Sequence, residues 1–265
     1  MRKNRLKIAI PALLIMMGAC TSPSKTEEKD STNDVQELKA NITLTKAPAS
    51  PEFPDATLTK SNISVVANDS MSAVDYSFDV ANYELGVQTE DAATRGIANS
   101  GKGQHIHFIV NNGPYSAHYM PGVNNQLADG DYTILAFLSR SYHESVKSEG
   151  AFHIENLKVG SADGDGADLT AQHLFYSRPK GTYKGEDTKK LMLDFYLVNT
   201  AISPEGNKVK ATINGDEFMI TEWAPYYIEG LAMGEVNIKL ELIDSEGNWI
   251  EGPFNSVERK VTLEQ

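Results

Sequence analysis

Apolar and polar residues alternate in short runs along most of the chain. The clearest runs are ISVVA (63–67), VDYSFDV (74–80), HIHFIV (105–110), YTILAFL (132–138), LMLDFYLV (191–198), VKATI (209–213) and NIKLEL (237–242). A period of two places successive side chains on opposite faces, which is typical of β-strands. Gly, Asn and Asp separate the runs, and beyond a turn at 90–98 no run has a convincing helical period. The pattern predicts an all-β protein.

The predicted strands recur as two copies. The matched segments are 78–85 with 195–202, 105–115 with 208–218, 127–138 with 231–242, and 152–159 with 256–263. The first pair is 117 residues apart and the others are 103 or 104 apart. The first copy therefore carries an insertion of roughly 14 residues within 86–104, and two copies of one domain are the simplest explanation.

The density of strands indicates the fold class. Seven or so short strands in about 100 residues point to an immunoglobulin-like β-sandwich. We predict two tandem immunoglobulin-like β-sandwich domains, at 56–160 and 172–265, joined by a linker at 161–171. Within the linker, DGDGAD (163–168) has spacings like those of a calcium loop, but the order of Asp and Gly is wrong for one. We interpret it as a flexible connection.

The first 19 residues have the three parts of a secretory signal. A basic start is followed by an apolar run at 8–17, and Gly18 and Ala19 then precede Cys20, the only cysteine. The run 17–20 resembles a bacterial lipobox, although Met17 stands where Leu is usual. We expect the signal peptide 1–19 to be removed by cleavage before Cys20, and Cys20 to be acylated. The lipid would anchor the protein in the outer membrane of the cell envelope, on its periplasmic or its surface face. The alternative is an ordinary signal peptide followed by an incidental cysteine.

Residues 20–55 are expected to form a flexible tether. The stretch is polar, charged and rich in proline, so it lacks the apolar surface needed to fold alone. The formal net charge of the chain is −12. This acidity argues against a nucleic-acid partner and against direct contact with anionic lipid headgroups. Membrane contact is therefore expected through the lipid anchor only.

Histidine is concentrated in the first copy. His105 and His107 are two positions apart on a predicted strand and share one face, whereas the second copy has Lys208 and Lys210 at these places. Neutral imidazoles on one face are a common start of a copper or zinc site, for which His118 or His143 is the candidate third ligand. The alternative is that His105 and His107 are half-buried side chains hydrogen-bonded to the backbone.

Aromatic and basic residues suggest other binding sites. Tyr115 and Tyr119 belong to an aromatic cluster that suits sugars or peptides, with a role in the core as the alternative. In the locally basic stretch 175–190, Arg178 and Lys180 suit a phosphate or an acidic peptide, with a solvated hairpin as the alternative. The chain has no G-x-S-x-G, H-E-x-x-H, G-x-G-x-x-G or P-loop motif, so no catalytic residue and no enzymatic activity are predicted.

Several longer stretches resemble a family of Gram-negative bacterial lipoproteins. They are 50–58, 80–92, 99–119, 127–147, 174–200 and 223–240, and together they cover most of 50–265. Some members of that family are labelled phosphopeptide-binding proteins. The resemblance implies an anion-binding role for Arg140, Arg178 or Lys180.

The leading hypothesis is a lipid-anchored, non-catalytic binding or scaffold protein that needs no cofactor. Its ligand, a peptide, phosphopeptide, glycan or envelope protein, would bind at the first-domain loops 86–104, 113–126 and 139–150, because the insertion and the histidines both belong to that copy. The alternative hypothesis is a copper- or zinc-binding envelope protein that uses His105, His107 and His118 or His143.

Overall fold

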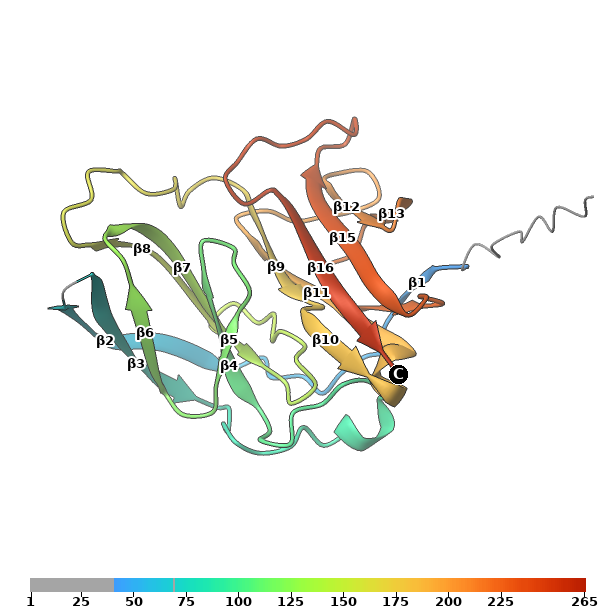
Figure 1. The fold of residues 1–265 in the computed structure, drawn as a ribbon, viewed down its shortest axis with the longest axis horizontal. Coiled ribbons are helices and arrows are strands. Elements are labelled where there is room, and N and C mark those ends of the chain that lie inside the picture. Colours follow the sequence, from blue (N-terminus) through green and yellow to red (C-terminus); the bar gives the residue numbers. More distant parts are fainter. Residues whose placement is uncertain (1–40, 69) are drawn as a thin grey trace, which may run out of the picture. The chain divides into compact units, whose positions relative to one another are not determined.

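The computed structural model describes residues 41–68 and 70–265 (Figure 1). Strands β1 to β16 and two short 3-10 turns, η1 (Ala92–Thr94) and η2 (Gly185–Thr188), make up the regular structure of these residues, which confirms the all-β prediction. None of the described segments is a helix long and apolar enough to cross a membrane. The predicted signal at 1–19, Cys20 and the first part of the predicted tether lie outside the described residues.

The first sandwich pairs a three-stranded sheet with a four-stranded one. The sheets run in the orders β2-β3-β6 and β5-β4-β7-β8. The strands are β2 (Thr57–Asn68), β3 (Met71–Ala81), β4 (His105–Val110), β5 (Ser116–His118), β6 (Gly122–Leu127), β7 (Gly130–Ser139) and β8 (Phe152–Val159). Alternate residues such as Tyr76, Phe108 and Ile134 point inward and form the core between the sheets. Strand β5 and most of β6 fall within 113–126, so the loop expected there is largely β-structure.

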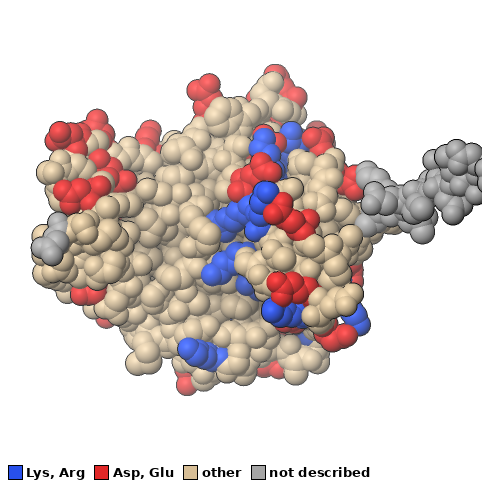
Figure 2. All heavy atoms as spheres, in the orientation of Figure 1, with Lys and Arg blue, Asp and Glu red and all other residues tan. Residues whose placement is uncertain are grey.

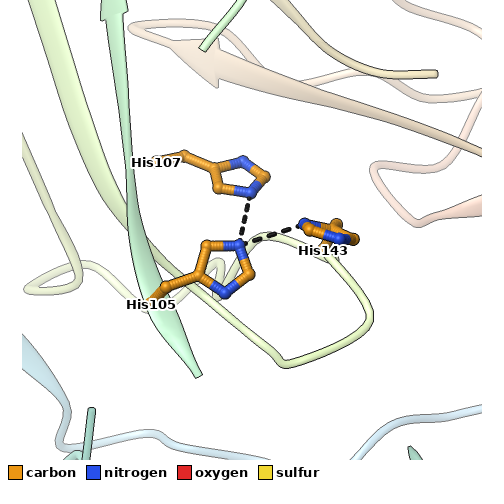
Figure 3. Close-up of side chains that lie close together, drawn as sticks. All are labelled: His105, His107 and His143. Carbon is orange, nitrogen blue, oxygen red and sulfur yellow. Dashed lines mark hydrogen bonds between the residues drawn. The ribbon is translucent and has the colours of Figure 1, made fainter. Parts of the chain in front are cut away.

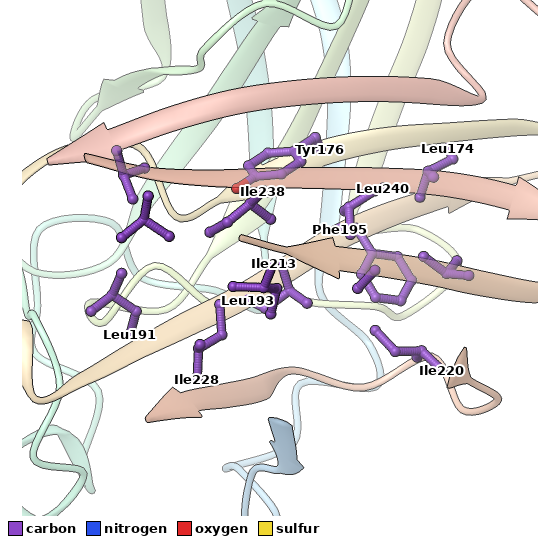
Figure 4. Packing of buried hydrophobic residues seen from close by; sticks show 14 of the residues in the cluster. Leu174, Tyr176, Leu191, Leu193, Phe195, Ile213, Ile220, Ile228, Ile238 and Leu240 are labelled. Carbon is purple, nitrogen blue, oxygen red and sulfur yellow. The ribbon is translucent and has the colours of Figure 1, made fainter. Parts of the chain in front are cut away.

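The second sandwich pairs a four-stranded sheet with a five-stranded one, in the orders β1-β14-β11-β9 and β10-β16-β15-β12-β13. The strands are β1 (Thr43–Lys46), β9 (His173–Arg178), β10 (Gly181–Lys184), β11 (Lys190–Val198), β12 (Lys208–Ile213), β13 (Asp216–Ile220), β14 (Tyr226–Glu229), β15 (Gly234–Ile243) and β16 (Ser256–Glu264). Figure 4 shows part of the core between these sheets, where Phe195, Ile213 and Leu240 are fully buried.

The two sandwiches repeat one strand arrangement. The neighbours β4-β7-β8 in the first correspond to β12-β15-β16 in the second. The connection from β3 to β4 spans 82–104, whereas the corresponding connection from β11 to β12 spans only 199–207. The extra length falls where the sequence spacing predicts the insertion. The prediction of tandem immunoglobulin-like β-sandwiches is confirmed.

Residues 41–55 differ from the predicted tether. Strand β1 pairs antiparallel with β14 at the edge of the second sandwich, and Ile42 and Leu44 pack against its core. The Arg95 guanidinium then donates to the carbonyl oxygens of Pro48 (2.9 Å) and Ala49 (2.7 Å). The prediction of a flexible tether is therefore wrong for 41–55, because strand pairing and these hydrogen bonds offset the entropy lost on ordering a polar segment.

The outer face of β4 and β7 is covered by the second sandwich. Ile109 and Phe137 on these strands belong to one buried cluster with Phe175 on β9 and Tyr196 on β11. The rings of Phe137 and Tyr196 stack with their centroids 4.7 Å apart. Strand β4 therefore has apolar surroundings on both faces, and this position decides the environment of its histidines.

Candidate metal centre

Strand β4 directs two histidines away from the core of its own sandwich. Ile106 and Phe108 face that core, so the alternation turns His105 and His107 to the opposite face, toward the second sandwich. Both histidines have 0% exposure. Both side chains are more buried than the alternative interpretation expected, because a second sheet covers the face that a lone sandwich would leave to solvent, but His105 does form the backbone hydrogen bond which that interpretation predicted, to Gly103.

A third histidine reaches the same place from the loop between β7 and β8. The backbone N–H of His143 donates to the carbonyl of Arg140 (2.9 Å), which closes a tight turn. His143 has a φ of 71°, in the left-handed region that few non-glycine residues adopt. Its side chain is half-buried. The turn therefore holds a costly backbone conformation while it points the imidazole toward β4.

The three imidazoles converge, as Figure 3 shows. Nε2 of His105 lies 2.9 Å from Nε2 of His107 and 3.1 Å from Nδ1 of His143. One nitrogen from each ring lies within 4.8 Å of the other two, and the described residues contain no other such group of three His, Cys, Asp or Glu ligands. Of the two third ligands expected, the fold brings His143 to the pair.

The remaining ring nitrogens of the β4 histidines are fixed by neighbours. Nδ1 of His105 lies 2.8 Å from the carbonyl oxygen of Gly103, which only accepts, so this nitrogen carries the proton. Nε2 of His105 therefore presents its lone pair to the other two rings. Nδ1 of His107 lies 3.2 Å from the Ser177 hydroxyl on β9, a partner able to accept or to donate. Such outer contacts orient histidine ligands in metal sites.

The insertion in the first copy supports this arrangement. Gly103, at its end, supplies the carbonyl that orients His105, and its φ is 87°. A Cβ there would lie 2.4 Å from a backbone oxygen, so only glycine fits. Thr89 and Ser141 exchange two hydrogen bonds, of 3.2 and 3.0 Å, and the N–H of Ser100 donates to the carbonyl of Ser141. The insertion thus braces the turn that carries His143.

Burial keeps the three rings neutral. Desolvation lowers the pKa of His105 from 6.5 to about 4, despite the opposing effect of the Gly103 carbonyl. Burial also lowers the pKa values of His107 and His143 well below 6.5, and the nearby charges of Arg178 and Lys180 act in the same direction. Neutral imidazole is the form that binds a metal ion. At pH 7 no ring carries a positive charge that opposes a metal ion, and His107 and His143, which donate to Nε2 of His105 in this arrangement, would turn a lone pair to the metal by a change of tautomer.

The two candidate tyrosines line this cluster. Tyr115 is buried, and its ring stacks on that of His107 with centroids 3.5 Å apart. Its hydroxyl accepts a hydrogen bond from Arg178 (2.9 Å) and lies 3.2 Å from Nδ1 of His143. The Tyr119 ring lies 5.0 Å from that of His105. Tyr115 is therefore a packing neighbour of the histidines and offers no exposed face for stacking a sugar.

Two other candidates lie outside the cluster. His118 on β5 places its Nε2 2.7 Å from the Ser116 hydroxyl and is not one of the three converging histidines. Arg140 is buried, forms an ion pair with Glu144 (3.1 Å), and donates to the carbonyl oxygens of Pro51 and Ser145. Its guanidinium holds the segment before β2 against the β7–β8 loop, which leaves the expected anion-binding role without support.

The remaining candidates, Arg178 and Lys180, reach Tyr115 from the end of β9. Arg178 donates to the Tyr115 hydroxyl. Lys180 Nζ donates to the backbone carbonyl of Tyr115 (2.8 Å) and lies 4.0 Å from the centroid of the Tyr115 ring. Sequence reasoning did not identify Ser177, the partner of His107, because no feature of the sequence marks it except its place beside Arg178. It also did not identify Arg259 on β16, because no recognisable motif surrounds that residue.

Comparisons with protein-family models and with curated proteins find no match. Among solved structures, the fibronectin(III)-like modules of Clostridium thermocellum CbhA match 77% of this chain and 95% of their own, with 11% identity and a TM-score of 0.28. The tandem V-type regions of VCBP3, a v-region-containing chitin binding protein, match 84% and 99%, with 9% identity and a TM-score of 0.24. Bacteroides ovatus SGBP-B, in complex with a mixed-linkage heptasaccharide, matches 83% and 47%, with 13% identity and a TM-score of 0.21. TM-scores this low assign neither family nor ligand, so the fold class rests on the sheets themselves.

Proposed function

We propose that this protein is a non-catalytic, metal-binding protein of the bacterial envelope, which holds copper or zinc on His105, His107 and His143. The convergence of three neutral imidazole nitrogens carries the proposal. Zn–N distances of about 2.0–2.1 Å in a tetrahedral site place ligand nitrogens about 3.3–3.4 Å apart. The separations of 2.9 and 3.1 Å from Nε2 of His105 would have to lengthen by a few tenths of an ångström, while the nitrogens of His107 and His143 lie within 4.8 Å of each other.

The surroundings favour holding a metal over using it in catalysis. Two of the three ligands are fully buried, and Tyr115 stacks directly on one of them. A catalytic metal needs an open position for substrate or water, whereas a buried site suits storage or delivery. Because the affinity of nitrogen sites rises from zinc to copper, we expect copper to compete better for the site.

Attachment to the envelope belongs to the same proposal. The signal pattern at 1–19 followed by Cys20 supports export, acylation and anchoring in the outer membrane. The described residues begin close to β1, which lies on the second sandwich. The lipid would therefore connect to the second sandwich, while the proposed metal is held mainly by the first. A direct test is the mass of the N-terminal peptide from the membrane fraction, with and without Cys20→Ser.

The metal proposal is tested by metal content. The protein is purified without chelating resin, loaded with copper or zinc, dialysed and analysed by inductively coupled plasma mass spectrometry. We expect about one metal ion per chain in the native protein and a loss in His107→Gln. The matched control is His118→Gln, on the adjacent strand but outside the cluster, which should retain the metal. Absence of metal from the loaded native protein, or equal loss in both variants, would contradict the proposal.

A further inference from the structure

Basic side chains gather on the surface where β10 and β16 lie near the turn before β5, a region that includes blue atoms near the centre of Figure 2. Lys180, Arg259 and Lys260 line a cavity of about 420 Å³ there, together with Pro114 and Gly181. Arg259 donates to the carbonyl oxygens of Asn112 and Gly113, both at 2.8 Å. The backbone of 112–115 therefore holds two of these cations at one side of the cavity.

The positive charges of this cavity are largely uncompensated. Lys260 forms an ion pair with Glu235 (2.7 Å). Neither Lys180 nor Arg259 has a carboxylate partner within the described ranges, and neither does Arg178, which is buried behind Tyr115. Buried donors on Arg178 (Nε) and Arg259 (a terminal nitrogen) also lack hydrogen-bond acceptors there. Buried charges are ordinarily paired, and this chain has twelve more acidic than basic residues to pair them with.

The surroundings of Lys180 and Arg259 disfavour their charged forms. Desolvation, followed by the charges of Arg178 and Arg259, lowers the pKa of Lys180. Desolvation lowers the pKa of Arg259 from 12.5 to about 10. A negatively charged ligand in the cavity would relieve both effects, because it pairs with the charges and supplies acceptors.

We infer that this cavity is a binding site for a divalent oxyanion, of the phosphate or sulfate class, held by Lys180 and Arg259 and favoured by the charge of Arg178. A guanidinium next to an ammonium group suits an anion with several acceptor oxygens. Two to three unpaired positive charges match a divalent anion better than a single carboxylate. The inference stands on these cations and their geometry, independently of the proposed metal.

The test is isothermal titration calorimetry on the full chain, with inorganic phosphate, sulfate, a phosphate monoester and acetate as separate ligands in chloride buffer. We expect phosphate and sulfate to bind, and acetate to bind at least ten times more weakly. Tighter binding of the monoester than of free phosphate would identify an anion carried on a larger molecule, and equal binding would identify the free ion. Both results support the inference.

Three variants test the residues. Lys180→Gln and Arg259→Gln should each weaken oxyanion binding at least tenfold. Lys184→Gln is the matched control, since Lys184 lies on β10, the strand that directly follows Lys180, and is already paired with Glu264 (2.8 Å). It should leave binding unchanged, and circular dichroism checks that each variant is folded. No oxyanion binding by the native chain, or equal losses in Lys184→Gln and Arg259→Gln, would overturn the inference.

Discussion

Asp194 on β11 ties the second sandwich to the loop that carries His143, and its removal should weaken both stability and metal binding. The side chain has 0% exposure. Its carboxylate accepts hydrogen bonds from the backbone N–H (3.2 Å) and hydroxyl (3.0 Å) of Ser145 and from the ammonium group of Lys147 (2.8 Å). All three donors belong to the β7–β8 loop, two to four residues beyond His143.

The cost of Asp194→Ala follows from what it leaves unpaired. Breaking a buried ion pair from one side costs about 3–5 kcal/mol, and Lys147, which is 18% exposed, recovers part of this by contact with water. The buried Ser145 N–H also loses its acceptor, at about 1–3 kcal/mol. We expect a total loss of about 3–4 kcal/mol in the free energy of unfolding. With an m-value of about 2 kcal/mol/M, the urea midpoint should fall by about 1.5–2 M.

Two further variants separate charge from packing. Asp194→Asn keeps an acceptor for Ser145 and should lose less stability than Asp194→Ala. Adding Lys147→Met to Asp194→Ala removes the unpaired ammonium and should restore part of the loss. Metal affinity, measured by competition with a chelator, should fall in Asp194→Ala, because the turn holding His143 loses its anchor. An unchanged urea midpoint in Asp194→Ala, or no recovery in the double variant, would refute this reasoning.

Three other predictions concern the rest of the fold. Deletion of 41–47 removes β1 and should lower the free energy of unfolding by about 2–3 kcal/mol in a urea titration, comparable to exposing one large apolar side chain; an unchanged midpoint would show that β1 adds nothing. Gly103→Ala should weaken metal binding measured by chelator competition while circular dichroism stays native, because the chain must shift at the carbonyl that orients His105; native affinity would contradict this. Burial alone would raise the pKa of Glu155, but the His153 ring 3.6 Å away and a hydrogen bond from the Lys60 ammonium group lower it from 4.5 to about 2. The lowered pKa stabilises the folded state above pH 4.5, and this contribution to stability is lost as the pH falls toward 2. Acid titration should therefore lower the free energy of unfolding of the native protein more than that of Glu155→Gln.

The local pattern of the sequence was sufficient for the strands and the repeat. Side-chain direction along a strand has a period of two, a property of each short segment by itself. It therefore placed His105 and His107 on one face and marked the inserted segment before them. The candidate third ligand was left open between His118 and His143, because nothing local says which loop approaches a given strand.

Only the tertiary structure decided the surroundings of the candidate site. The match of His107 with Lys210 suggested that the fold itself has no need of histidine, but the two positions differ in environment. The second sandwich covers His107, whereas Lys210 is half-exposed and paired with Glu241 (3.1 Å). Contacts between distant segments decide the burial of His107, the approach of His143 and the pairing of β1 with β14. Strand periodicity carries no information on those contacts, since it describes the faces of a strand and not what packs against them.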